Sequence, residues 1–131
     1  MGDVIAADQK WHNMHNDDVV LRIDKVNKAN STFAGAYGMK RARDGAVIDW
    51  FPLRGEYDPQ GITIGWVVSY WTGYFNWNSL DAWAGYLRLG LDQGSKWIIS
   101  TTRISVQGEN DTTVFPDTFV LEESDSKLVA N

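Results

Sequence analysis

Arg103 is the residue whose position points most directly to chemistry. The segment Trp97–Val106 alternates in the way of a half-buried β-strand, and the alternation places Arg103 on the same face as Ile99. A guanidinium turned toward an apolar interior needs a carboxylate or an anionic ligand beside it, and Asp81 and Asp117 are the candidate carboxylates. Such a group can bind a polar ligand, and it can equally orient a substrate for proton transfer.

An aromatic stretch from Ile62 to Gly85, ITIGWVVSYWTGYFNWNSLDAWAG, is the second feature. Its first part has a period of two, which predicts a strand that places four side chains on one face: Ile64, Trp66, Val68 and Tyr70. From Thr72 to Asp81, Gly, Asn and Ser predict a turn, yet this turn carries large aromatic residues: Tyr74, Phe75 and Trp77. We therefore expect a pocket wall followed by a lid or a subunit interface.

The composition limits the class of protein. With 131 residues we expect a single domain over 1–131, with a core from about residue 10 to 121 and frayed termini. Seven Trp, five Tyr and five Phe are more aromatic surface than so small a core needs, so part of it should line a ligand site or a subunit interface. A net charge of -5 with interspersed signs disfavours nucleic acid and anionic membranes as partners.

Cysteine and histidine usage narrows the chemistry further. Without Cys there is no disulfide, thiolate metal ligand or nucleophilic thiol. His12 and His15 form an isolated pair in a strand and turn, so we expect no metal site and no cofactor. The first ten residues, MGDVIAADQK, contain no signal peptide and no membrane span, and we expect a soluble, cytoplasmic protein.

The elements that must position these residues are short strands separated by polar turns. The expected strands are Lys10–Asn13, Asp18–Lys25, Thr32–Gly38, Ala46–Asp58, Ile62–Trp71, Ala82–Gly90, Trp97–Val106 and Thr113–Leu121. Pro52 should break the fourth strand, because proline is tolerated in a sheet only at an edge or bulge. The series predicts an all-β fold, an eight-stranded antiparallel up-and-down β-barrel.

The order of several motifs resembles the avidin and streptavidin family over roughly residues 10 to 120. The central hairpin of that family is similar to Gly65-Trp66-Val67-Val68, Tyr70, Ser79, Trp83 and Gly85, without a gap. Four further strands of the family have similar residues here. Its first strand is similar to Trp11 and Asn13, its third to Gly35 and Tyr37, its fourth to Leu53, Gly55 and Tyr57, and its last to Asp117-Thr118-Phe119. The resemblance implies an avidin-like barrel around one small ligand, with biotin as the default ligand, and a homo-oligomer, either dimer or tetramer.

The resemblance also implies a ligand site in which polar contacts are partly changed. Asn13, Asp17 and Tyr37 take the places of the family's Asn, Ser and Tyr, which donate hydrogen bonds to the ureido oxygen of biotin. An ionised Asp17 only accepts and would repel that oxygen. Asp117 keeps the place of the Asp that accepts one ureido proton, whereas Met39 replaces the Ser that accepts the other.

The remaining family positions surround the sulfur ring and the tail of biotin. Ser79 matches the Ser that contacts the carboxylate tail, and Asp81 replaces the Thr beside the ring sulfur. Trp83 keeps one apolar wall, whereas Tyr70 and Arg103 replace two further Trp. The resemblance therefore implies a pocket that suits a polar ligand better than biotin.

Two alternatives stay open on the sequence. Asp17 and Asp81 lie next to predicted turns, where Asp is common, and could simply face water. The function could be ligand binding without catalysis, which we favour. It could also be that of a small barrel enzyme, of isomerase or cyclase type, that uses the carboxylates and Arg103 in the barrel cavity.

Overall fold

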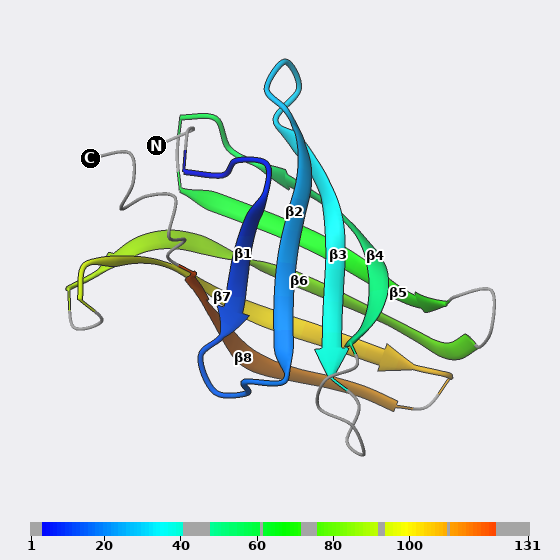
Figure 1. The fold of residues 1–131 in the computed structure, drawn as a ribbon. Helices are drawn as coiled ribbons and strands as arrows, with labels where there is room; N and C mark the ends of the chain where they lie inside the picture. Colours follow the sequence, from blue (N-terminus) through cyan, green and yellow to red (C-terminus); the bar gives the residue numbers. More distant parts are fainter. Residues whose placement is uncertain are drawn as a thin grey trace.

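Eight antiparallel strands form a closed barrel in which every strand pairs with its sequence neighbours and β1 pairs with β8 (Figure 1). The computed structural model describes residues 4–40, 48–60, 62–71, 76–91, 94–109 and 111–122. The strands are β1 (Gln9–Asn13), β2 (Val19–Asn27), β3 (Thr32–Lys40), β4 (Ile48–Tyr57), β5 (Thr63–Trp71), β6 (Asn76–Gly90), β7 (Lys96–Gln107) and β8 (Asp111–Leu121). The predicted fold is confirmed. In the described part of the chain, no helix is long and apolar enough to span a bilayer.

Alternation along the strands decides which side chains fill the barrel. The inward positions of β5 and β6 pair directly, Trp66 opposite Trp83 and Val68 opposite Asp81. The rings of Trp66 and Trp83 stack with centroids 5.5 Å apart, and Phe119 of β8 meets Trp66 edge-on at 5.5 Å. Fully buried aromatic rings of this kind supply most of the apolar contact area in a barrel this narrow.

The turn predicted from Thr72 to Asp81 is wrong in its second half. Strand β6 already begins at Asn76, and the ladder to β5 pairs Leu80 with Ser69 and Asn76 with Trp71. Ser79 also pairs with Gln107 of β7, so this segment is held from both sides. Asn and Ser favour turns as isolated residues, but two flanking ladders override that local preference.

Other parts of that predicted lid or interface lie outside the described residues. Tyr74 and Phe75 belong to the undescribed connection, and the side chain of Trp77 is not described.

The break expected at Pro52 is also wrong, because β4 continues through it. Pro52 pairs with Ala36 of β3, but the ladder from β4 to β5 begins only at Leu53, opposite Val68. At Pro52 the strand therefore has a ladder only on the side of β3. On the side of β5 there is no ladder, so the N–H that proline lacks removes no hydrogen bond there. The side chain is exposed and points out of the barrel.

The strands place one set of ends around a common opening. β1, β3, β5 and β7 end there, and β2, β4, β6 and β8 begin there, in the lower right of Figure 1. Asn13, Met39, Ser79 and Asp81 are all near this end of their strands. The fold thus brings residues from distant parts of the sequence to one end of the interior.

Glycine at position 85 permits the close approach of β6 and β7. A Cβ atom built on Gly85 would lie 1.9 Å from the backbone oxygen of Ser100 and 2.6 Å from Cα of Thr101. Both are backbone atoms of the paired strand, so relief requires the two strands to separate.

We expect Gly85→Ala to destabilise the barrel by about 1–3 kcal/mol through this overpacking. Denaturant unfolding measures the change in the free energy of unfolding. Ala84→Ser, at the neighbouring exposed position, serves as the control and should leave it nearly unchanged. Equal stability of Gly85→Ala and the wild type would contradict the packing described here.

Candidate functional site

Arg103 lies inside the barrel and forms an ion pair with Asp81. Its Nε donates to Asp81 Oδ2 at 2.8 Å, and its Nη2 donates to the same oxygen and, at 3.2 Å, to the hydroxyl of Tyr70. The Tyr70 hydroxyl in turn donates to Asp81 Oδ2 at 2.8 Å. Asp81 is 1% exposed, so the alternative that it faces water is wrong. The predicted carboxylate partner of Arg103 is thus present.

Three aromatic rings lie close to the guanidinium of Arg103. Its central carbon lies 4.8 Å from the ring centroid of Trp83, 5.0 Å from that of Phe115 and 5.9 Å from that of Tyr37. These distances are those of cation–π contacts, which are stronger where water is excluded. Sequence reasoning did not select Phe115, although its parity with Asp117 placed it on the inward face. It is the direct cross-strand partner of Arg103.

Asp117 is the second carboxylate of the interior. Its Oδ1 accepts a hydrogen bond from Asn13 Nδ2 at 2.5 Å, and its Oδ2 accepts one from Trp83 Nε1 at 2.8 Å. Oδ2 also lies 3.6 Å from Nη1 of Arg103, within ion-pair distance. Thr101 Oγ1 donates to the backbone oxygen of Asp117 at 2.7 Å. Asp117 therefore connects β1, β6 and β7 through one side chain.

The other predicted site residues are placed less centrally. Tyr37 is buried, and its ring meets Tyr70 edge-on with centroids 6.3 Å apart. Met39 and Ser79 are partly buried, near the barrel opening on β3 and β6. Asp17 is exposed in the connection between β1 and β2. Its contact with a ligand stays a prediction, and its solvent-facing alternative agrees with this exposure.

Within the described part of the chain, one oxygen of Asp81 has no hydrogen-bond partner. The three donors around Asp81 all converge on Oδ2, whereas Oδ1 is buried and accepts nothing. The indole Nε1 of Trp66 is likewise buried without an acceptor. An unsatisfied buried polar group costs about 1–3 kcal/mol, so both atoms favour any molecule that completes their bonding.

Burial and charge act on the ionisable groups of the cluster. Burial raises the pKa of Tyr37 and of Tyr70 well above the ordinary value, and the nearby Arg103 only partly opposes this. Burial on its own would lower the pKa of Arg103, but the phenols and Asp81 raise it. Arg103 therefore keeps its charge inside the barrel, and both phenols stay neutral.

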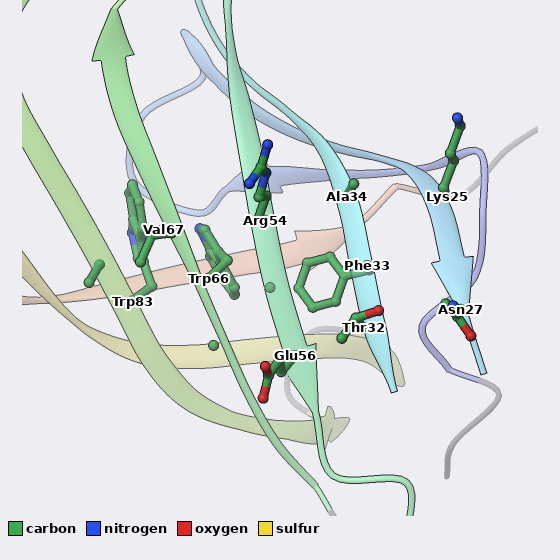
Figure 2. A pocket seen from close by; sticks show the side chains of 13 residues that line it. Lys25, Asn27, Thr32, Phe33, Ala34, Arg54, Glu56, Trp66, Val67 and Trp83 are labelled. Atoms are coloured by element: carbon green, nitrogen blue, oxygen red, sulfur yellow. The ribbon is translucent and has the colours of Figure 1, made fainter. Parts of the chain in front are cut away.

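A hollow is lined by outward-facing side chains of the strands and by the buried rings of Phe33, Trp66 and Trp83 (Figure 2). It has a volume of about 750 Å³, and Lys25, Arg54, Glu56 and Val67 line it. Small residues at the outward positions of β3, β5 and β6 leave it open: Ala34, Gly65 and Ala82. Among the described lining residues, Trp83 is the predicted site residue, and the hollow shares it with the cluster around Arg103.

Metal ligands are not grouped in the part of the chain that the structure describes. No set of three or more His, Asp or Glu side chains there could hold an ion.

The fold and the interior site define a closed barrel with a polar cluster at one end, and the sequence places it in a family. The sequence model of the Avidin family matches residues 2–121, which include all eight strands of the barrel. The chain therefore belongs to the Avidin family. A comparison with curated protein sequences gave no significant match.

Solved structures show the same fold. Apo shwanavidin has a TM-score of 0.73 at 21% identity, covering 91% of this chain and 98% of that chain. A complex of a shwanavidin variant with biotin has a TM-score of 0.72 at 21% identity, covering 90% and 97%. A rhizavidin–biotin complex has a TM-score of 0.72 at 20% identity, covering 91% and 94%.

We expect the alkaline stability of the barrel to reflect the two buried phenols. Above pH 10 the tyrosines of the unfolded chain ionise, whereas folded Tyr37 and Tyr70 keep their protons. The contribution of the two phenols to the free energy of unfolding is thus fully present below pH 10. Above pH 10 it is lost, by up to about 2.7 kcal/mol per pH unit for the two groups together.

Absorbance at the phenolate band, followed during alkaline unfolding, measures when Tyr37 and Tyr70 ionise. A step equivalent to these two phenols should accompany unfolding, and the double variant Tyr37→Phe with Tyr70→Phe should remove it. Tyr86→Phe, on the exposed outer face, is the matched control and should retain the step. Complete tyrosine titration before unfolding would contradict the burial of these side chains.

Proposed function

We propose that this chain is a small-molecule-binding barrel without catalysis, whose interior site takes a polar ligand and binds biotin weakly or not at all. The observation that carries the proposal is the Arg103 guanidinium, which lies on the face of Trp83 and is tied to Asp81 and Tyr70. Biotin is the reference ligand because two structures of similar fold, of a shwanavidin variant and of rhizavidin, are biotin complexes.

Four residues of the interior support the proposal of a ligand site. Asn13, Tyr37, Trp83 and Asp117 meet in the interior near the barrel opening, and Asp117 bonds to both Asn13 and Trp83. A small molecule entering from this end would meet aromatic walls and several hydrogen-bonding groups. This mixture is typical of small-molecule sites, in which a few polar groups fix the orientation of the ligand.

The polar pair makes the site unfavourable for an apolar ring. A ligand that separated Arg103 from Asp81 would leave uncompensated charge, a change that costs about 3–5 kcal/mol for a buried pair. If Arg103 keeps its place, an apolar ring must instead pack against a charged group. Because about 1.4 kcal/mol corresponds to a tenfold change in affinity, either case lowers biotin affinity by orders of magnitude.

We expect calorimetry near neutral pH to show weak or undetectable biotin binding by the wild type. Arg103→Trp with Met39→Ser should strengthen binding at least tenfold, because these changes restore an apolar wall and a hydrogen-bonding hydroxyl. Adding Asp17→Ser tests separately whether this exposed residue reaches the ligand.

Arg54→Trp, which changes an exposed arginine on the outside of β4, is the matched control and should leave biotin binding unchanged. Tight biotin binding by the wild type would overturn the proposal of a changed ligand. The family's default ligand would then be the ligand of this chain too.

We also propose that the protein is a homo-oligomer, either dimer or tetramer. The outer face of β5 to β8 carries apolar side chains that are 36% to 62% exposed: Val67, Leu80, Tyr86, Ile104, Val106 and Val114. The ladders place Ile104 next to Val114 and Leu80 next to Val106, so these residues form continuous patches. Continuous exposed apolar surface of this kind favours association with another chain.

Light scattering at micromolar concentration should give a mass above that of one chain. Ile104→Lys with Val114→Lys should shift the protein toward the monomer, because each charge would have to be buried in the interface. Thr32→Lys, on β3 and outside the patches of β6 to β8, is the control and should preserve the oligomer. A monomeric wild type would contradict the proposal and would mean that the apolar face is exposed to solvent and forms no interface.

A further inference from the structure

The unpartnered oxygen of Asp81 and the charges around it point to the chemical class of the ligand. We propose that the interior site selects a compact, planar N–H-donating cation, of the amidinium or guanidinium kind, which binds Asp81 Oδ1. This inference rests on the proposed function, because it names the ligand class of the same site. The contact is made by Asp81, which stands where the avidin-like family has a Thr, so the residues that match the family do not supply it.

The first step of the argument is the one-sided bonding of the carboxylate. Arg103 and the hydroxyl of Tyr70 both bond to Oδ2 of Asp81, and Oδ1 accepts no hydrogen bond. A carboxylate can accept at both oxygens, so half of its capacity is unused. Asp81 faces the interior and is 1% exposed, which leaves a donor inside the barrel as the way to satisfy Oδ1.

The second step is the balance of charge. Asp81 and Asp117 carry two formal negative charges, and Arg103, which pairs with both, carries one positive charge. The cluster is therefore formally negative by one charge. In an interior of low dielectric constant this remaining charge attracts a cation and repels an anion more strongly than it would in water. A cationic ligand would leave the whole cluster neutral.

The third step is the set of groups around Asp81 and its position along β6. Tyr70 is flanked by the rings of Tyr37 and Phe51, with centroids 6.3 Å and 5.1 Å away, so the groups next to Asp81 are aromatic. Planar cations bind favourably against such rings. Ser79, two residues before Asp81 and on the same face of β6, is only partly buried and pairs with the last residue of β7. Asp81 is thus close to the opening.

Calorimetry with three compounds of nearly the same shape tests the charge requirement. Benzamidine is a planar cation with N–H donors, benzamide is its neutral counterpart, and benzoate is the anion. We expect benzamidine to bind at least tenfold more tightly than benzamide, and benzoate to show no binding. Equal binding of all three compounds, or no binding of benzamidine, would overturn the inference.

Two variants with opposite expected effects locate the contact. Asp81→Asn removes the charge but keeps the size, and it should weaken benzamidine binding at least tenfold. Arg103→Gln removes the competing cation and should strengthen it. Asp24→Asn, in the exposed ion pair with Arg22, is the matched control and should have no effect. Circular dichroism confirms that each variant is folded, and unchanged benzamidine affinity in folded Asp81→Asn contradicts the inference.

The outcomes also separate this inference from the proposed function. If benzoate binds instead, and Arg103→Gln abolishes its binding, the barrel is still a binder of polar ligands, and only the cationic class is wrong. If no compound of the series binds and biotin binds tightly to the wild type, the proposed function itself fails.

Discussion

Closure of the barrel is the constraint on which the rest of the structure depends. The ladder between β1 and β8 pairs Trp11 with Leu121 and Asn13 with Phe119, which gives the sheet a closed inside. Because side chains alternate along each strand, closure decides for every residue whether it faces that inside. A charged residue at an inward position cannot turn to water and must find its partner within the barrel.

The polar cluster and the aromatic core consequently stabilise each other. The ring of Trp83 stacks on Trp66 on one side and contacts the guanidinium of Arg103, while its indole N–H bonds to Asp117. One side chain thus belongs to the core and to the site at once. The position of the guanidinium is fixed by packing as well as by charge, and sites whose groups are held in this way bind with less loss of conformational freedom.

Sequence reasoning succeeded where the period of two was undisturbed, and it failed where local propensity opposed the ladders. The inward orientation of Arg103 and its need for a carboxylate partner followed from parity together with the cost of an unpaired buried charge, whereas the orientation of Asp81 stayed open. Asn76–Asp81 was expected to be a turn, since Asn and Ser favour turns, but pairing with β5 and β7 makes it a strand. Phe115 was missed because its contact with Arg103 depends on the register between β7 and β8, which cannot be counted from one strand alone.

The same physics explains how the inward residues of such a barrel can vary while its ladders stay the same. Inward side chains contribute no backbone hydrogen bonds, so residues such as Asp81 and Arg103 can change the interior without changing the ladders. Their positions are linked, however. Asp81 pairs with Ser105 in the register, which places Arg103 two residues along the neighbouring strand and within reach as a diagonal neighbour. Asp81 without Arg103 would be a buried carboxylate with no cation beside it, and Arg103 without Asp81 would keep only the longer pair with Asp117. The chemistry of this cluster is therefore a property of the pair.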